Sequence, residues 1–350
     1  MIFGAQIAIP SLVRIKAGAL DRMGLYLSRE NYQRAVLLYS CDLAPELINR
    51  VAASLKEHGV DLQQQVCIEQ ASFEKATDLF SHFPANTDAV IGLGGGKALD
   101  TAKYAAFLAR LPYYAAPTSL SNDGFGSPQS SLTLNGKRRS LACRLPFAIV
   151  IDTQVCLQAP DVLWWAGIGD LVSKVTAIAD WKLAFHAVGT PVNDFAALLS
   201  DATVAQFMAR PVRDLDGVSS LGTALMLNGT AMEISGSSRP ASGSEHLISH
   251  ALDHISPRPH LHGMQVGVAT YIVSRLQGQG TERIARVLDE TDFWRGITAA
   301  PFSRREWIDA VALAPRMKDD YYTVLSSRDC VPEVAAMLRD DPRLIPCFTD

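Results

Sequence analysis

Cysteine pairs of the kind that bind zinc or form redox centres are missing from this sequence. Its six cysteines are scattered along 350 residues, and no two of them are separated by only two residues. Scattered cysteines of this kind are typical of reduced thiols in the cytosol and do not make a disulfide framework. We therefore expect free thiols and a cytoplasmic location.

An excess of positive charge is missing as well. Charged residues make up 19% of the chain, and its formal net charge is −4. This balance gives no reason to expect nucleic acid or an anionic membrane as a partner. No apolar run is long and uninterrupted enough to cross a bilayer, and residues 1–10 lack the basic region of a signal peptide. We expect neither a membrane span nor a secretory signal.

The sequence does contain enough apolar residues, 48% of the chain, to bury a full core in about two domains. In the first half, short apolar runs alternate with helical patterns, which predicts an α/β domain with a parallel sheet and helices on both faces. The expected strands are 32–40, 65–68, 89–91, 113–117 and 147–152, and the expected helices are 43–58, 72–80 and 97–110.

After Asp152 the strand pattern stops, and the remaining chain is predicted to be helical. The expected helices are 161–187, 191–208, 213–236, 242–254, 262–276, 280–289 and 304–313. We therefore place an α/β nucleotide-binding domain at 1–153 and an all-helical domain at 154–350.

A glycine-rich loop, residues 92–96, joins the central strand to the helix that begins near Lys97. Backbone N–H groups at a helix N-terminus lack partners and lie at the positive end of the helix dipole, so they attract anions. Glycine lets a phosphate approach closely because no Cβ intervenes. The loop is therefore a candidate cradle for a dinucleotide pyrophosphate, and the alternative is a tight turn that binds nothing.

Two commoner nucleotide motifs are excluded at this loop. A Walker A motif would require glycine at Ile91 and a hydroxyl at Ala98. A Rossmann fingerprint would require an acidic residue about 20 residues further on, where the chain has only apolar residues and tyrosines, at 111–115.

Polar residues follow two other predicted strands. Asp42 could bind a ribose hydroxyl or cap the helix expected from Leu43, and the two roles are compatible. The run 117–128 is dense in hydroxyls and glycine and is either a binding segment or a polar turn. Asn135-Gly136 predicts a type I′ hairpin, and its returning strand would carry a basic run, 137–139.

Histidines are concentrated in one part of the predicted helical domain. Five of the eight lie between His246 and His262, and His246, His250 and His254 share one helical face. This density favours a metal site, although the HExxH motif is absent. Two histidines and one carboxylate with an open position suit Zn²⁺, Fe²⁺ or Ni²⁺. Asp170 is a candidate carboxylate, but it could instead cap a helix that begins beside it.

Together, these motifs resemble the iron-containing alcohol dehydrogenase superfamily, which includes glycerol dehydrogenases and dehydroquinate synthases. The segments 121–128, 169–177 and 242–250 are most similar to the sn-glycerol-1-phosphate dehydrogenase branch. The resemblance implies a dehydroquinate synthase-like fold and a metal in the cleft between two domains. It also implies NAD or NADP as cofactor and interconversion of dihydroxyacetone phosphate and sn-glycerol 1-phosphate.

The resemblance also assigns roles to individual residues. The pyrophosphate would be held by Gly94, Gly95, Gly96 and Lys97, and the cofactor site would further include Asp42, Asp100, Thr118, Ser121 and Ser127. Asp123 would contact substrate or cofactor, and His250 would lie near the metal. The chemistry of ketone reduction separately makes His250 a candidate for passing a proton to solvent. Asp170, His246 and His262 would hold the divalent metal.

The chain departs from the family pattern where Met264-Gln265 follows the last His-Gly, because an acidic residue is common there. The segment 253–261 could also reshape the substrate pocket. We therefore keep open the reduction of another phosphorylated or polyol-like ketone, a dehydroquinate-synthase-type cyclase, and a protein that has lost activity.

A phosphorylated substrate needs a cation to offset desolvation of its phosphate. Lys174 lies one helical turn after Asp170 and is the better candidate for this role, because the basic run 137–139 could be only a solvated strand edge. The expected partners are this small molecule and further copies of the chain in a homo-oligomer.

Overall fold

The computed structural model describes residues 7–350, which form two compact units. Unit 1 comprises the chain up to Ala159 together with Asp214–Glu233, and unit 2 comprises Pro160–Arg213 together with Ile234–Asp350. The predicted boundary at 153 gives each domain one continuous segment, whereas helix α9 (Leu215–Ser235) returns almost entirely to unit 1.

Unit 1 is built on a six-stranded parallel sheet in the order β1-β8-β5-β4-β2-β3. This confirms the predicted α/β class and adds an edge strand, β1, that the sequence analysis missed. The strands are β1 (Leu12–Lys16), β2 (Arg34–Ser40), β3 (Asp61–Ile68), β4 (Ala89–Gly94), β5 (Tyr113–Pro117) and β8 (Ala148–Asp152).

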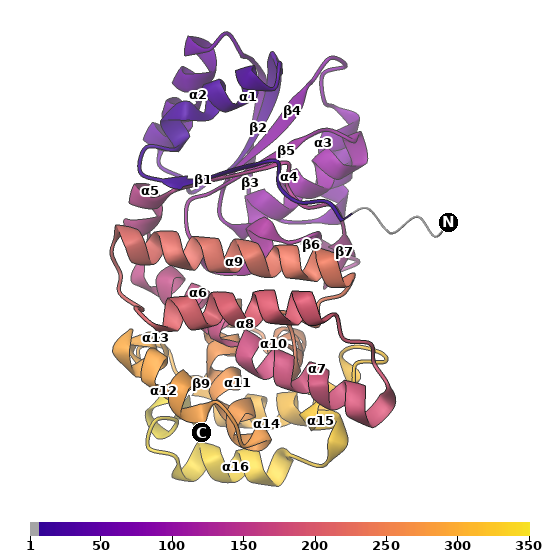
Figure 1. Cartoon of the computed structure of the whole chain (residues 1–350), viewed down its shortest axis with the longest axis vertical. Helices are drawn as coiled ribbons and strands as arrows, with labels where there is room; N and C mark the ends of the chain where they lie inside the picture. The colour runs from indigo at the N-terminus through magenta and orange to yellow at the C-terminus, as the bar shows by residue number, and fades with distance from the viewer. Residues whose placement is uncertain (1–6) are drawn as a thin grey trace. The chain divides into compact units, whose positions relative to one another are not determined.

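Helices cover both faces of this sheet. Side chains alternate in direction along each strand, so apolar residues lie on both faces and pack against these helices. Leu37, Ile91 and Val150 point into a core formed with α1 (Met23–Arg29) and α2 (Pro45–Glu57). The other face packs against α4 (Gly96–Ala109), and α3 (Phe73–Ser81) packs against α4 in turn (Figure 1). Short helices at 20–22 (η1), 123–126 (η2) and 153–157 (α5) complete the connections.

The predicted hairpin is confirmed. Strands β6 (Gln129–Leu134) and β7 (Lys137–Ala142) pair antiparallel, and both turn residues have positive φ, 51° at Asn135 and 74° at Gly136. These are the values that a type I′ turn requires. The basic run at its start lies on an exposed strand edge, as the less specific interpretation proposed.

Unit 2 is predominantly helical, as expected. The buried helix α11 (His262–Gln277) lies at its centre and packs against α6 (Asp161–Val172) and α10 (Ser244–Ile255). The other α-helices are α7 (Lys174–Val188), α8 (Asp194–Met208), α12 (Thr281–Glu290), α13 (Phe293–Thr298), α14 (Arg304–Leu313), α15 (Val324–Ser327) and α16 (Val331–Asp340). The expectation that strands stop after Asp152 is wrong in one detail, because β9 (Phe302–Ser303) pairs with β10 (Phe348–Thr349). Two short 3-10 turns, 314–316 (η3) and 345–347 (η4), adjoin them.

The structure bears on two expectations, one about a membrane span and one about the cysteines. The segment Asp161–Val188 is apolar enough to cross a membrane by length and composition, with a mean hydropathy of 1.3 over an 18-residue window, but 72% of that window is buried within the protein. Core helices of soluble proteins pass the same test. The expectation that all cysteines are free is wrong, because Cys41 and Cys67 form a disulfide with a Cα–Cα distance of 4.9 Å. Cys41 directly follows β2 and Cys67 lies in β3, and these strands are neighbours in the sheet, which sequence spacing could not reveal.

Candidate active site

The glycine loop forms an open cradle at the carboxyl end of β4. Gly94 has φ of 130°, which favours glycine, and an added Cβ there would collide with Ser40. The N–H of Gly95 donates to the Ser40 hydroxyl at 3.0 Å. By contrast, an added Cβ on Gly95 or Gly96 would meet no atom within 4 Å. Gly94 and Ser40 therefore shape the loop, and the start of α4 is left accessible with Lys97 exposed beside it.

A buried lysine fixes the polar segment that follows β5. Lys103 of α4 donates from Nζ to the carbonyls of Gly124, Ser127 and Gln129 at 2.6, 3.1 and 2.7 Å. Its Nζ also lies 3.8 Å from a carboxylate oxygen of Asp100. Burial raises the pKa of Asp100 and lowers that of Lys103, and each charge opposes the effect on the other. Sequence reasoning missed Lys103, although its i, i+3 spacing from Asp100 on a buried helix was a usable signal.

The structure distributes the predicted cofactor residues between accessible and buried positions. Thr118 and Ser121 are half-buried, and the Thr118 N–H donates to the carbonyl of Gly94 at 3.1 Å. Ser127 is only 4% exposed, and its hydroxyl donates to the carbonyl of Gln129 at 3.1 Å. Asp123, at the start of η2, is half-buried in unit 1.

Asp42 is exposed and does not cap a helix. The expected cap is wrong because α2 begins at Pro45 with Ala44 as its N-cap, and proline suits the first helical position. A ribose contact by Asp42 stays a prediction.

The three predicted metal ligands converge within unit 2. Asp170 of α6, His246 of α10 and His262 of α11 each offer a ligand atom, and these atoms all lie within 4.8 Å of one another. His246 Nε2 is 3.4 Å from Asp170 Oδ1, and the two imidazole rings have centroids 5.2 Å apart. Asp170 is fully buried, and His262 is half-buried. Two imidazoles and one carboxylate at this spacing fit a divalent metal.

Glycine contacts between α6 and α11 bring two of these ligands together. A Cβ on Gly169 would collide with the backbone of Gly263, and a Cβ on Gly263 would collide with the backbone of Ala166. The backbones are therefore in direct contact at the residues that adjoin Asp170 and His262. The alternative that Asp170 caps a helix is wrong, because α6 begins at Asp161 and Asp170 lies near its end.

Comparisons with known proteins extend over both units. Residues 14–160 match the family described as iron-containing alcohol dehydrogenase. A relative from Aeropyrum pernix is 33% identical over 342 residues, covering 95% of this chain and 96% of its own. One from Methanosphaera stadtmanae is 34% identical over 292 residues, covering 82% and 83%. Both carry the name glycerol-1-phosphate dehydrogenase [NAD(P)+].

The chain belongs to the iron-containing alcohol dehydrogenase family, in its glycerol-1-phosphate dehydrogenase branch. It is therefore an enzyme of the alcohol dehydrogenase class. Solved structures agree on the fold. Glycerol dehydrogenase from Schizosaccharomyces pombe has a TM-score of 0.74 at 18% identity, covering 95% of this chain and 91% of its own. Maleylacetate reductase from Agrobacterium tumefaciens has a TM-score of 0.67 at 16% identity, covering 94% and 96%.

In this dehydrogenase, burial and neighbouring charges have opposite effects on the pKa values of the ligands Asp170 and His246. Burial alone would raise the pKa of Asp170, but Lys174 and His246 outweigh it and hold that pKa well below its ordinary value. Burial alone would lower the pKa of His246, but hydrogen bonds to Asp170 and Glu245 raise it to about 9. The cluster therefore combines an ionised carboxylate with a His246 imidazole whose pKa is raised by its two carboxylate neighbours.

The two remaining predicted residues lie beside the cluster. Lys174 is fully buried, and its Nζ is 3.3 Å from Asp170 Oδ1. His250 is exposed, and its ring centroid is 6.1 Å from that of His262. Lys174 thus contacts the predicted ligand Asp170, while exposed His250 lies beside the predicted ligand His262.

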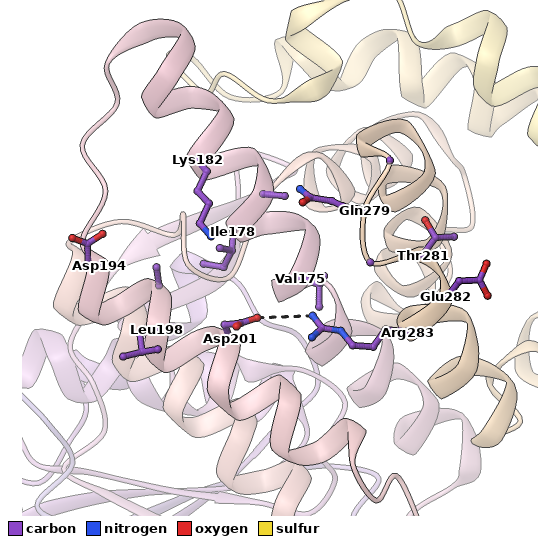
Figure 2. A pocket seen from close by; sticks show the side chains of 14 residues that line it. Val175, Ile178, Lys182, Asp194, Leu198, Asp201, Gln279, Thr281, Glu282 and Arg283 are labelled. Atoms are coloured by element: carbon purple, nitrogen blue, oxygen red, sulfur yellow. Dashed lines mark ion pairs between the residues drawn. The ribbon is translucent and has the colours of Figure 1, made fainter.

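A separate pocket of unit 2 contains none of the predicted site residues. It has a volume of about 860 Å³ and lies among α7, α8 and α12, with Val175, Leu198 and Gly280 in its wall. Figure 2 shows Asp201 and Arg283 facing each other in this pocket, 3.9 Å apart. Its walls carry no histidine, so we do not assign the chemistry to it.

Proposed function

We propose that this enzyme is a metal-dependent NAD(P)H oxidoreductase that interconverts dihydroxyacetone phosphate and sn-glycerol 1-phosphate. The observation that carries the proposal is the convergence of Asp170, His246 and His262 from three helices of unit 2. The names of relatives 33–34% identical to the chain support the substrate pair. The open glycine cradle of unit 1 supports a dinucleotide cofactor.

Cofactor binding falls to residues of unit 1. Backbone N–H groups at the start of α4 would receive the pyrophosphate, since Gly95 and Gly96 leave space for it. Lys97, exposed at the same turn, would add a positive charge. Thr118 and Ser121 present half-buried hydroxyls on the adjoining segment, which Lys103 holds in place.

Asp170, His246 and His262 would hold one divalent ion, which we expect to be zinc, iron or nickel. When bound, the nicotinamide supplies a hydride, and the ion stabilises the negative charge that develops on the ketone oxygen. His250 would exchange a proton between the substrate oxygen and solvent, and its exposure beside His262 supports this role. Asp123 is proposed to contact substrate or cofactor.

Lys174 is proposed to assist either the substrate phosphate or the metal. It is a fully buried cation beside a predicted ligand, and a buried phosphate needs such a charge. Its contact with Asp170 gives the other role, in which the ammonium keeps the ligand carboxylate ionised and oriented.

An assay of NADH and NADPH oxidation against paired ketones tests the proposal. Dihydroxyacetone phosphate should be reduced in preference to unphosphorylated dihydroxyacetone, with sn-glycerol 1-phosphate as product. A preference for unphosphorylated dihydroxyacetone or glycerol would favour a glycerol dehydrogenase instead. A cyclase of the dehydroquinate-synthase type would turn over its own substrate without net change in NADH absorbance.

The cellular location and the assembly are two further inferences. We infer a cytoplasmic enzyme from the composition and the metabolic class of its relatives, although the Cys41–Cys67 disulfide is uncommon in reducing compartments. We also infer a homo-oligomer, which analytical ultracentrifugation would test.

A further inference from the structure

The histidine from α10 is held by the residue that precedes it. Glu245 is fully buried, and His246 Nδ1 lies 2.9 Å from its Oε1. The same oxygen accepts the N–H of Gly243 at 2.5 Å, and Oε2 accepts the Thr176 hydroxyl at 2.8 Å. An ionised carboxylate has no proton and can only accept, so Nδ1 is the donor to Oε1.

This contact determines which nitrogen of His246 faces the other ligands. With the proton on Nδ1 directed at Glu245, the neutral ring keeps its lone pair on Nε2. Nε2 is the atom that lies 3.4 Å from Asp170 Oδ1. The ring is thus oriented for coordination by a carboxylate that is not itself a ligand.

The second histidine is oriented by a different pair of residues. Ser249 is fully buried, and its hydroxyl donates to Gln265 Oε1 at 2.6 Å. The same hydroxyl oxygen lies 3.0 Å from His262 Nδ1. A serine hydroxyl has one proton, and here Gln265 receives it, so Ser249 must accept from His262. His262 therefore also carries its proton on Nδ1 and leaves Nε2 for the metal.

We propose that Glu245 and the Ser249–Gln265 pair are positioning residues that fix both histidine ligands as Nδ1–H tautomers, with Nε2 as the ligand atom. The inference rests on the proposed function, because it assigns these residues to the same metal site. Side chains that hold the distal nitrogen of a ligand histidine commonly alter metal affinity roughly 10- to 100-fold when removed. Gln265 gains a specific role, since its amide oxygen sets the direction of the Ser249 hydroxyl.

The direction of this chain of hydrogen bonds distinguishes positioning from simple packing. If Gln265 instead presented its NH₂ group, Ser249 would donate to His262 Nδ1 and the proton would move to Nε2. A carboxylate at position 265 can only accept, so Gln265→Glu should preserve the arrangement. Gln265→Met has a similar length but offers no strong acceptor, so it should lose the arrangement.

Zinc affinity measured by competition with a chromophoric chelator tests the proposal in the full-length protein. We expect Ser249→Ala and Gln265→Met to weaken zinc binding roughly 10- to 100-fold. Gln265→Glu should bind zinc as well as or better than the wild type. Glu245→Ala should weaken binding at least as much as Ser249→Ala. Equal affinities in Gln265→Met and Gln265→Glu, or unchanged affinity in Ser249→Ala, would overturn the proposal.

A second measurement separates this proposal from the proposed function. Proteins labelled with ¹⁵N-histidine and stripped of metal can be examined at alkaline pH, where NMR correlations report which ring nitrogen carries the proton. The proposal predicts the Nδ1–H form for His262 in the wild type and in Gln265→Glu, and loss of that preference in Ser249→Ala. An Nε2–H form in the wild type would refute the positioning role. Failure of the wild type to bind zinc, with the Nδ1–H form intact, would count against the proposed function alone.

Discussion

Replacing Gly95 by valine tests the cofactor cradle without disturbing the fold. Gly95 has φ of −88° and ψ of 178°, an extended conformation that a β-branched residue adopts readily. An added Cβ meets no protein atom within 4 Å, so the side chain would project into the space that we assign to the pyrophosphate. Valine is less favourable than glycine at this N-cap of α4, which offsets the gain from restricting the unfolded chain, so the free energy of unfolding should change by no more than about 1 kcal/mol.

The expected loss of affinity follows from the contacts that valine would block. Hydrogen bonds to a charged group contribute roughly 1.5–3 kcal/mol each. Keeping the phosphate away from two N–H groups of the first turn of α4 would therefore cost roughly 3–6 kcal/mol, or about a 10²- to 10⁴-fold weaker Kd for NADH. Quenching of protein fluorescence by NADH provides the titration, and thermal denaturation confirms that the variant is folded.

Gly94→Ala, one residue earlier, is the matched control, because it should reduce stability, whereas Gly95→Val should reduce NADH binding. Gly94→Ala introduces a Cβ at φ of 130° and against Ser40, so it should lower the free energy of unfolding by about 1–3 kcal/mol. Gly95→Val should leave stability intact and lose NADH binding. If folded Gly95→Val binds NADH like the wild type, the pyrophosphate lies elsewhere and the cradle is misassigned.

Three further substitutions address other parts of the site. If Lys174 binds the substrate phosphate, Lys174→Ala should raise KM for dihydroxyacetone phosphate sharply and hardly affect KM for dihydroxyacetone. Equal losses of kcat with both substrates would show instead that Lys174 acts through its contact with Asp170. Lys103→Met should lower the free energy of unfolding by about 3–5 kcal/mol in chemical denaturation, because it removes the buried ammonium from three backbone carbonyls and from the buried carboxylate of Asp100; an unchanged value would contradict the role of Lys103 in holding this segment. Burial, followed by repulsion from Glu245, raises the pKa of Asp180 to about 6. Because the pKa of Asp180 is higher in the folded than in the unfolded protein, its contribution to stability is present below pH 4 and is lost as the pH rises through 6. Relative to Asp180→Ala, the wild type should therefore lose about 3 kcal/mol of unfolding free energy over this range. Parallel curves of stability against pH for the two proteins would contradict this.

Local patterns accounted for much of unit 1. The glycine loop, the Asn135-Gly136 hairpin and the alternation of strands with helices were predictable because each depends on residues that are near one another in sequence. Strand β1 was not predicted, since it is ordered by pairing with β8, which begins at Ala148. The return of α9 to unit 1 is likewise a matter of long-range packing.

The sequence predicted the metal ligands, but not the buried residues that hold the site's side chains and loops in place. His246 and His262 were found from their density, and Asp170 from family resemblance, but Asp170 was placed at the start of a helix that it nearly ends. Glu245 and Lys103 were missed because their importance comes from burial among partners distant in sequence. Their partners include Thr176 and the carbonyls of 124–129, which no local pattern connects to them.

The measurement that tests the central claim most directly is metal content together with activity. The purified enzyme is stripped with a chelator, titrated with zinc, iron or nickel, and assayed for reduction of dihydroxyacetone phosphate by NADH or NADPH. We predict that activity returns in proportion to about one equivalent of metal per chain, and that His262→Ala, folded by circular dichroism, neither retains the metal nor recovers activity. Full activity in the stripped protein, or in His262→Ala with unchanged metal content, would contradict the assignment of Asp170, His246 and His262 as a metal centre.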